Sequence, residues 1–501
     1  MALALGPSLA GRAEEAEGIF ALETLRVPGR PLEATLAPAP DGRPPDLVVA
    51  AVEGTPPEEE RRLVLFPPPP APRAPRPPAS TVRAPGDAVF FDVAELGPGP
   101  GPELVFVSDT ALRIVNPRSG ESREIALSPP LGLPPQTRNL TRLACVADWQ
   151  GDGRPAALLP TATGARLVPL AGGEARALPL PLVAEYETRA NAPPPHSGSM
   201  SAFVVWPELV RADDDGDGRL DLFALSRFGV AVHRLGPGGL SLAPTRWIPL
   251  RPFTPAEELR PRTTGLFLRV RDLDGDGRAD LVVSRAVGTL LHSHSSTEVY
   301  RNPGDGVRLP AAPDARLGVD SGLATVELED LDGDGRVELV QGSIAFGVMQ
   351  VVRVLTTRRA QIEVRVYRLA APGIAGATLA WQGEISLALD LEQGRVSGLL
   401  PLVSGDWNGD GRKDLLVGTD RDTLAVYLGE ATPQGPGFAS RAIEQTAPVA
   451  GNALVADLDG DGLEDLVMWD TRDVSGAVHV LRNRGSLPGT PASLRAVGQP
   501  P

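Results

Sequence analysis

The sequence is poor in several residue types that often reveal a function. It has one cysteine, Cys145, in the apolar stretch LACVAD, which predicts a buried, inert thiol and no internal disulfide. Aromatic residues make up only 4 %, so a core must be built mainly from Val, Leu and Ala. No run of 18 apolar residues is present, so no membrane-spanning helix is expected. The chain also lacks a nucleophile elbow and a phosphate-binding glycine loop, so we expect that it is not an enzyme.

What the sequence does contain is a repeated string of aspartate and glycine. DLDGDGRADLVV, residues 272–283, places carboxylates at positions one, three, five and nine of a loop that Gly275 and Gly277 can close. Calcium takes six to eight oxygen ligands, and the carbonyl of Arg278 at position seven can add another. An EF-hand would need a Glu at position twelve, where Val283 stands, and helices on both sides. Because the flanking residues are β-formers instead, the string predicts a calcium loop between two strands.

Five copies of this loop are intact. The predicted side-chain ligands are Asp213, Asp215, Asp217, Asp221, Asp272, Asp274, Asp276, Asp280, Asp330, Asp332, Asp334, Glu338, Asp406, Asn408, Asp410, Asp414, Asp457, Asp459, Asp461 and Asp465. The predicted carbonyl ligands at position seven are those of Arg219, Arg278, Arg336, Arg412 and Leu463. A single acidic turn could be no more than a solvated loop, but five copies at similar spacing are typical of a structural repeat.

Three further segments are degenerate. A sixth loop, DWQGDGRPAA at 148–157, keeps Asp148, Gln150 and Asp152, but Ala156 replaces the last carboxylate. This loop is therefore expected to bind an ion weakly or to stay empty. Segments near 40–50 and at 91–107 keep the strand pattern and lose the ligands, so no ion is expected there.

The spacing of the repeats predicts the architecture. The eight copies begin near 41, 92, 148, 213, 272, 330, 406 and 457, and only short strands lie between them. Periods in this range are typical of propeller blades of four strands. We therefore predict an all-β fold, a single β-propeller over residues 18–486 with eight blades, or seven if a degenerate repeat is not a blade. Residues 18–27, GIFALETLRV, should complete the last blade and close the ring. Residues 1–17, as a mobile tail or signal remnant, and the Pro/Gly-rich residues 487–501 should lie outside it.

With these loops in place, the chain resembles FG-GAP/VCBS-repeat proteins, which include integrin α-subunits. The segments YRNPGDG at 300–306 and LRNRG at 481–485 also look like the strand ends of such repeats. The resemblance implies a calcium-binding propeller and says almost nothing about the partner.

The charge supports a metal-binding role. The formal net charge is −15, and six divalent ions, carrying twelve positive charges, would reduce it to −3. Nucleic acid is therefore not expected as a partner. Weak calcium sites fill where calcium is millimolar, so we expect a secreted, periplasmic or cell-surface location. The single lysine, Lys413, among many arginines indicates a bacterial, GC-rich genome. We expect a monomer.

The long connections suggest where a partner binds. Those near 183–202, 251–263, 285–296 and 342–360 should open on the face opposite the acidic loops, which makes that face the expected binding face. Its candidate contact residues are Tyr186, Asn191, His196, Phe253, His292 and His294.

Two functions are considered. The favoured one is a calcium-stabilised, non-enzymatic binding or adhesion scaffold for a protein or glycan. The alternative is a carbohydrate-active enzyme similar to rhamnogalacturonan lyases, some of which have eight-bladed propellers with calcium. Such an enzyme would need a base, and His196, His292 and His294 are the candidates. His292 and His294 could form a metal or proton-transfer site, but a polar loop is the favoured interpretation.

Overall fold

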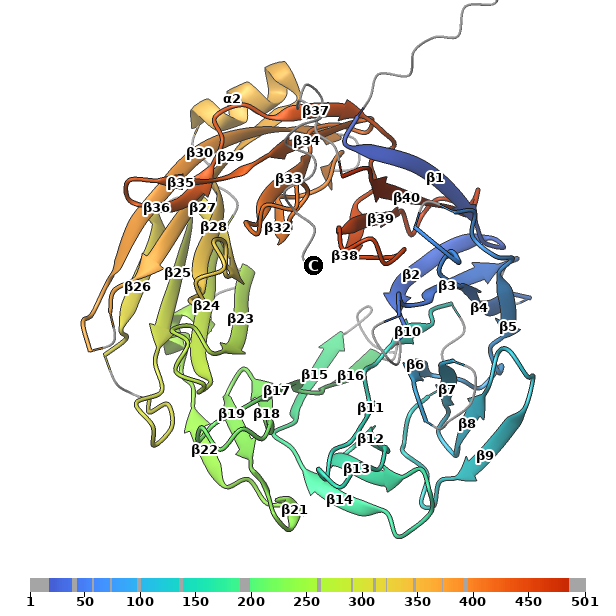
Figure 1. Cartoon of the computed structure of the whole chain (residues 1–501). Coiled ribbons are helices and arrows are strands. Elements are labelled where there is room, and N and C mark those ends of the chain that lie inside the picture. The colour runs from blue at the N-terminus through green and yellow to red at the C-terminus, as the bar shows by residue number, and fades with distance from the viewer. Residues whose placement is uncertain are drawn as a thin grey trace, which may run out of the picture.

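The computed structural model describes residues 18–37, 43–55, 58–72, 74–96, 101–134, 138–189, 199–258, 263–289, 292–309, 312–320, 322–345, 348–371, 373–390 and 395–485. The predicted tails, 1–17 and 487–501, lie outside these residues. Within the described residues the chain forms eight sheets that are arranged in a ring (Figure 1). The prediction of an all-β propeller with eight blades is confirmed, and the alternative of seven is excluded.

Each blade contains four antiparallel strands, the first of which lies nearest the centre of the ring (Figure 1). Blade 1 consists of β2 (Arg30–Leu36), β3 (Leu47–Glu53), β4 (Glu60–Phe66) and β5 (Ser80–Arg83). Blade 2 consists of β6 (Phe90–Ala94), β7 (Glu103–Val107), β8 (Ala111–Val115) and β9 (Ser122–Ala126), with the short β10 (Thr141–Arg142) added parallel to β6. Blade 3 consists of β11 (Val146–Ala147), β12 (Ala156–Thr161), β13 (Gly164–Pro169) and β14 (Arg176–Pro179). The two segments without ligands are therefore true blades.

Blades 5 and 6 carry the longest strands. Blade 4 consists of β17 (Glu208–Ala212), β18 (Asp221–Ser226), β19 (Gly229–His233) and β22 (Arg246–Pro249). Blade 5 consists of β23 (Thr263–Arg271), β24 (Asp280–Thr289), β25 (His292–Tyr300) and β26 (Ala315–Asp320). Blade 6 consists of β27 (Gly322–Glu329), β28 (Glu338–Ala345), β29 (Arg359–Leu369) and β30 (Ala377–Asp390), with β31 (Arg395–Val396) added to β30.

The last two blades close the ring. Blade 7 consists of β32 (Leu402–Gly405), β33 (Asp414–Gly418), β34 (Thr423–Tyr427) and β37 (Ile443–Thr446). Blade 8 consists of β38 (Asn452–Ala456), β39 (Asp465–Trp469), β40 (Ala477–Asn483) and, from the other end of the chain, β1 (Phe20–Arg26). β1 pairs antiparallel with β40 over seven residues, from Phe20↔Asn483 to Arg26↔Ala477. The predicted closure by residues 18–27 is therefore confirmed.

The hydrophobic core is divided among the blade interfaces. Eight clusters of buried side chains are found, and each joins one blade to the next around the ring. Between blades 5 and 6, for example, Val299 and Leu317 pack against Leu339. Because alternate residues of a strand face opposite neighbours, every blade is covered on both faces. No blade can bury its apolar surface alone, which explains why the ring must close.

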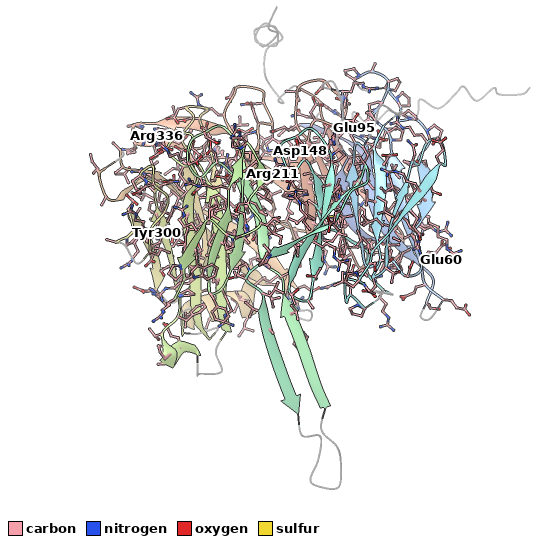
Figure 2. All side chains as sticks on the ribbon, turned by 90° about the horizontal axis from the view of Figure 1, so that it is seen from below. Glu60, Glu95, Asp148, Arg211, Tyr300 and Arg336 are labelled. Carbon is pink, nitrogen blue, oxygen red and sulfur yellow. The ribbon has the colours of Figure 1, made fainter. Side chains whose placement is uncertain are left out.

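A few elements lie outside the blades. These are the hairpins β15–β16 (Val183–Arg189 and Ser199–Val205), β20–β21 (Leu235–Gly236 and Gly239–Leu240) and β35–β36 (Gly429–Thr432 and Gly435–Phe438), and the helices α1 (Pro255–Glu258) and α2 (Val348–Thr357). Figure 2 shows β15–β16 projecting from the face opposite Asp148 and Arg336, which belong to two of the acidic loops. Within the described residues, no helix combines the length and the apolar character needed to cross a membrane.

Candidate metal centre

The acidic loops join the first and second strands of blades 3 to 8, as predicted from the sequence. In blade 5 the first aspartate, Asp272, organises the loop. Its Oδ1 atom accepts the backbone N–H of Gly275 at 2.8 Å, and its Oδ2 atom accepts that of Gly277 at 2.8 Å. Both glycines have positive φ, 77° and 81°, which lets the chain curl around the carboxylate.

The other four intact loops repeat this arrangement. In each of them the first aspartate accepts the N–H groups of both loop glycines. These bonds are Gly216 and Gly218 to Asp213 (2.7 and 2.7 Å), Gly333 and Gly335 to Asp330 (2.8 and 2.9 Å), Gly409 and Gly411 to Asp406 (2.7 and 2.8 Å), and Gly460 and Gly462 to Asp457 (2.6 and 3.0 Å). The repeated sequence therefore corresponds to a repeated geometry.

The ninth carboxylate of each loop is buried. In blade 5, Asp280 accepts the N–H of Leu273 at 3.1 Å and that of Asn302 at 2.7 Å. Burial raises its pKa to about 7, against the lowering effect of these two bonds. Burial likewise raises the pKa of the equivalent carboxyl in the other intact loops, to about 7 for Glu338, Asp414 and Asp465, and raises that of Asp221. This residue thus ties the loop to the end of the third strand.

The donor set suits a hard cation. Four groups of carboxylates have ligand atoms within 4.8 Å of one another: Asp213, Asp215 and Asp221; Asp272, Asp274 and Asp276; Asp330, Asp332 and Glu338; and Asp457, Asp459 and Asp465. The Oδ1 atoms of Asp274 and Asp332 are buried and have no hydrogen-bond partner within the described part of the chain. Buried oxygens without a donor fit a divalent cation, which prefers oxygen ligands. These groups can therefore hold a metal ion.

Two loops differ from this set. In the loop of blade 7 the third position is Asn408, which donates to Asp410 at 3.1 Å. In the loop of blade 3 the described residues form no group of three carboxylates, as the sequence indicates. Burial raises the pKa of Asp148, but four backbone N–H bonds outweigh it and lower the pKa overall. The weak binding expected at Asp148 and the position-seven carbonyl ligands stay predictions.

In blades 1 and 2 a buried aspartate is paired with an arginine. Asp92 is buried and accepts the guanidinium N–H of Arg142 at 2.9 Å and the backbone N–H of Val146 at 2.8 Å. Asp46 directly precedes β3, at a position that corresponds to Asp280, the first residue of β24. Asp46 is paired with Arg118 at 2.9 Å. This use of arginine was not predicted from the sequence, because the two partners are far apart along the chain.

Two asparagines connect the loops to one another. The Asn302 side chain donates to the carbonyl of Asp214, in the loop of blade 4, at 2.8 Å. The Asn483 side chain donates to the carbonyl of Trp407, in the loop of blade 7, at 3.0 Å. The sequence contained the signal, because both stand in the segments YRNPGDG and LRNRG that end a third strand.

The candidate binding face is described only in part. The side chains of Tyr186, Asn191, His196 and His292 lie outside the described residues. Phe253 is half-buried in the segment between β22 and α1. His294 is exposed, and its Nδ1 atom lies 2.8 Å from Asp320.

The favoured interpretation of 285–296 as a polar loop is wrong. Residues 285–289 and 292–296 continue β24 and β25, which pair as far as Thr289↔His292. The Ser295 hydroxyl donates to the carbonyl of Gly322 in blade 6 at 3.2 Å. A hydroxyl side chain thus forms a hydrogen bond to the neighbouring blade at a position where an apolar side chain would ordinarily pack. Because the strand has no apolar pattern here, it could not be recognised from the sequence.

The comparisons with known proteins agree with the fold. The model of the FG-GAP-like repeat matches residues 272–340 and 406–468, which contain four of the five intact loops. No curated protein matches the chain.

Solved structures are similar only at low identity. The biofilm matrix protein Bap1 of V. cholerae is 14 % identical, with 92 % of this chain and 89 % of that chain covered and a TM-score of 0.41. The WD40 domain of SCAP from fission yeast is 10 % identical, with 96 % and 98 % covered and a TM-score of 0.39. The repeats, their loops and the ring of eight sheets confirm the resemblance found in the sequence: the chain is an eight-bladed β-propeller built with FG-GAP-like repeats.

Proposed function

We propose that the protein is a calcium-stabilised, non-enzymatic scaffold that works outside the bacterial cytoplasm and binds a protein or glycan partner. One observation carries this proposal: the two faces of the propeller are differently built. The acidic loops lie on one face, and β15–β16 projects from the other (Figure 2). The repeat thus stabilises the ring at one face and leaves the other free to vary, as in other folds whose loops carry function.

Calcium is the proposed ion because the candidate ligands are carboxylate, amide and carbonyl oxygens in loops. Calcium tolerates irregular sets of six to eight oxygens, whereas magnesium demands a near-octahedral site. Sites of this kind are filled at the millimolar calcium concentrations found outside cells. This supports a secreted, periplasmic or cell-surface location.

The proposed binding face exposes apolar side chains. Phe203, Val204 and Val205 at the base of the β15–β16 hairpin are each more than half exposed, as are Phe228 and Leu355. Exposed apolar residues that gather on one face are typical of an interaction site.

Residues of blades 5 to 7 line a cavity of about 370 Å³. Phe267, Val326, Ile362 and Leu400 are among its lining residues. Its apolar lining favours a protein partner over a glycan.

The experiment compares two sets of substitutions that replace exposed apolar residues on opposite faces. The test variant carries Phe203→Ser, Val352→Gln and Leu355→Gln. The control carries Leu220→Ser, in an acidic loop, and Ile374→Gln, in a connection that follows a third strand on the same face as those loops. Binding would be measured to a panel of immobilised bacterial surface proteins and glycans at millimolar calcium. We expect the test variant to lose binding at least about tenfold and the control to keep it.

Two outcomes would contradict the proposal. Equal loss of binding in both variants would show that the face opposite the acidic loops is not the binding face. Cleavage of a uronide polymer by the unmodified protein at millimolar calcium would show that it is an enzyme.

A further inference from the structure

In three successive blades an arginine stands at the end of the third strand or directly after it. Tyr300, Tyr367 and His233 each pair with the tenth residue of their own acidic loop. The next residue is an arginine in each case, namely Arg234 in blade 4, Arg301 in blade 5 and Arg368 in blade 6. The fold therefore brings a permanent positive charge to the same place beside three different loops.

In blade 6 this arginine contacts three carboxylates of the loop. The Nε atom of Arg368 lies 3.0 Å from Glu338, and a terminal nitrogen lies 3.7 Å from Asp332. The same nitrogen is also paired with Asp334. The guanidinium thus sits against the third, fifth and ninth positions, which are the proposed cation ligands.

Blades 4 and 5 repeat the contact. Arg301 Nε lies 3.2 Å from Asp274 Oδ2, and both side chains are more than nine-tenths buried. Arg234 lies 3.0 Å from Asp215 and 3.1 Å from Asp214. In all three blades the arginine therefore reaches the carboxylate at position three.

Blade 7 lacks this charge. Tyr427 pairs with Leu415, the tenth residue of that loop, so the equivalent of the arginine is Leu428. Leu428 packs against the core shared by blades 7 and 8. Among the described residues, no arginine or lysine forms an ion pair with Asp406, Asp410 or Asp414.

We propose that Arg234, Arg301 and Arg368 are built-in counter-cations for the loops of blades 4 to 6. In these blades the guanidinium offsets part of the repulsion among the carboxylates, so the loop needs a metal ion less and binds one more weakly than it would without the arginine. The blade 7 loop lacks the arginine and also lacks the carboxylate at position three, where Asn408 stands, so its net charge equals that of the blade 6 loop with Arg368. The physical reason is Coulomb's law, since a positive charge a few ångströms away opposes the entry of a dication. This inference rests on the proposed binding of calcium.

The test reads each loop separately in the intact protein. Hydrogen exchange, followed by mass spectrometry of peptides that cover 330–340 and 406–418, is measured over a series of free calcium concentrations. We expect calcium to protect both peptides, and the half-saturating calcium concentration of each peptide is the value that the variants should change.

Two variants and one control isolate the arginine. Arg368→Gln removes the charge and keeps a hydrogen-bond donor, and it should lower the half-saturating calcium concentration of 330–340 by about tenfold. Leu428→Arg should raise that of 406–418 by a similar factor. Arg365→Gln is the matched control, because Arg365 lies on the same strand, is 27 % exposed like Arg368, and pairs with Glu363 at 2.7 Å instead of with the loop. It should change neither value.

The outcomes separate this inference from the proposed function. If calcium protects the loops but Arg368→Gln leaves the half-saturating concentration unchanged or raises it, the counter-cation role is overturned. If Leu428→Arg fails to fold, Arg368→Gln still decides the matter. If calcium protects no loop in the unmodified protein, the proposed calcium binding itself fails.

Discussion

At the scale of single residues, each loop separates two kinds of carboxylate. The ninth residue, such as Asp280, is buried and accepts two backbone N–H groups from different strands. The fifth residue, such as Asp276, is exposed and accepts the N–H of Arg278 at 2.8 Å. The ninth residue therefore has a structural role even without an ion, whereas the fifth matters mainly as an ion ligand.

This difference predicts that Asp280→Asn destabilises the fold in the presence of a chelator. Asparagine has one acceptor oxygen where aspartate has two, so the N–H of Leu273 or of Asn302 is left buried and unpaired, at a cost of about 1–3 kcal/mol. Asp276→Asn should cost less than about 0.5 kcal/mol under the same conditions. Urea unfolding at pH 8 in chelator measures both. Equal effects would show that the ninth carboxylate has no structural role of its own.

Because His233 is buried, the stability of the fold should decrease in acid. His233 is fully buried, and its Nδ1 atom lies 3.0 Å from the carbonyl of Ser241. Burial lowers its pKa below 6.5, an effect larger than the opposing bond to Ser241. As the pH falls, the His233 side chain is therefore protonated in the unfolded chain at a higher pH than in the folded chain. The contribution of His233 to the free energy of unfolding is fully present above pH 6.5 and is lost as the pH falls below 6.5. The slope is at most about 1.4 kcal/mol per pH unit.

The matching measurement compares unfolding free energies between pH 7 and pH 5 for the unmodified protein and for His233→Gln. The unmodified protein should lose more stability on acidification, because glutamine does not titrate. Identical pH profiles would mean that His233 is not held neutral by the fold.

At the scale of elements, the seven-residue strand β1 closes the ring. It supplies the outer strand of blade 8, and its Phe20 backbone is bonded on both sides by the Gln445 side chain of blade 7, at 2.9 and 2.8 Å. The Phe20 ring stands edge-on to Trp407 with centroids 5.2 Å apart. One strand from the beginning of the chain therefore joins two blades from its end.

The prediction for this element compares two residues on the same strand. Phe20 is 1 % exposed and Leu22 is 49 % exposed. Phe20→Ala should lower the free energy of unfolding by about 3–5 kcal/mol, because it leaves a cavity at the junction of blades 7 and 8. Leu22→Ala should change it by less than about 0.5 kcal/mol. Denaturant unfolding gives both values, and a small loss for Phe20→Ala would show that the ring does not depend on this closure.

Much of the element order could be predicted from the sequence, because the strings of Asp and Gly mark every first-to-second turn from blade 3 onward. The extension of β24 and β25 could not be predicted, since the run of Ser, Thr and His in it reads as a polar connection. One of its hydroxyl groups, that of Ser295, donates to the carbonyl of Gly322, which lies in another blade. The arginines beside the loops were missed for a similar reason. Which loop an arginine such as Arg368 meets is fixed by strand pairing and not by its neighbours in the sequence.

At the scale of the whole molecule, the acidic loops form a connected belt. The eighth residue of one loop donates its backbone N–H to the loop of the preceding blade, as Ala279 does to Asp213 at 2.7 Å and Val337 does to Leu273 at 3.0 Å. Lys413 continues the series to Leu331 at 3.0 Å. Because the blades are joined both by this belt and by their apolar interfaces, an ion that orders one loop also supports its neighbours.

The belt leads to the prediction that calcium contributes a large part of the stability. An ion that binds only the folded chain adds about 1.4 kcal/mol per site at a concentration ten times its Kd. Five intact loops would then add roughly 7 kcal/mol, comparable with the whole stability of a typical protein. This sum is an upper bound, because the unfolded acidic segments also bind some calcium.

Adding chelator to the calcium-loaded protein should therefore lower the Tm strongly and in one cooperative step. The double substitution Asp274→Ala and Asp276→Ala, which disables one loop of the five, should lower the Tm in calcium by a smaller amount. That variant should also lose less on chelation than the unmodified protein does, because one of its sites is already missing. Calorimetry on protein whose calcium content has been measured beforehand distinguishes these cases. A Tm that chelator does not move would mean that the carboxylates, the arginines beside the loops and the backbone N–H groups hold the loops without any ion.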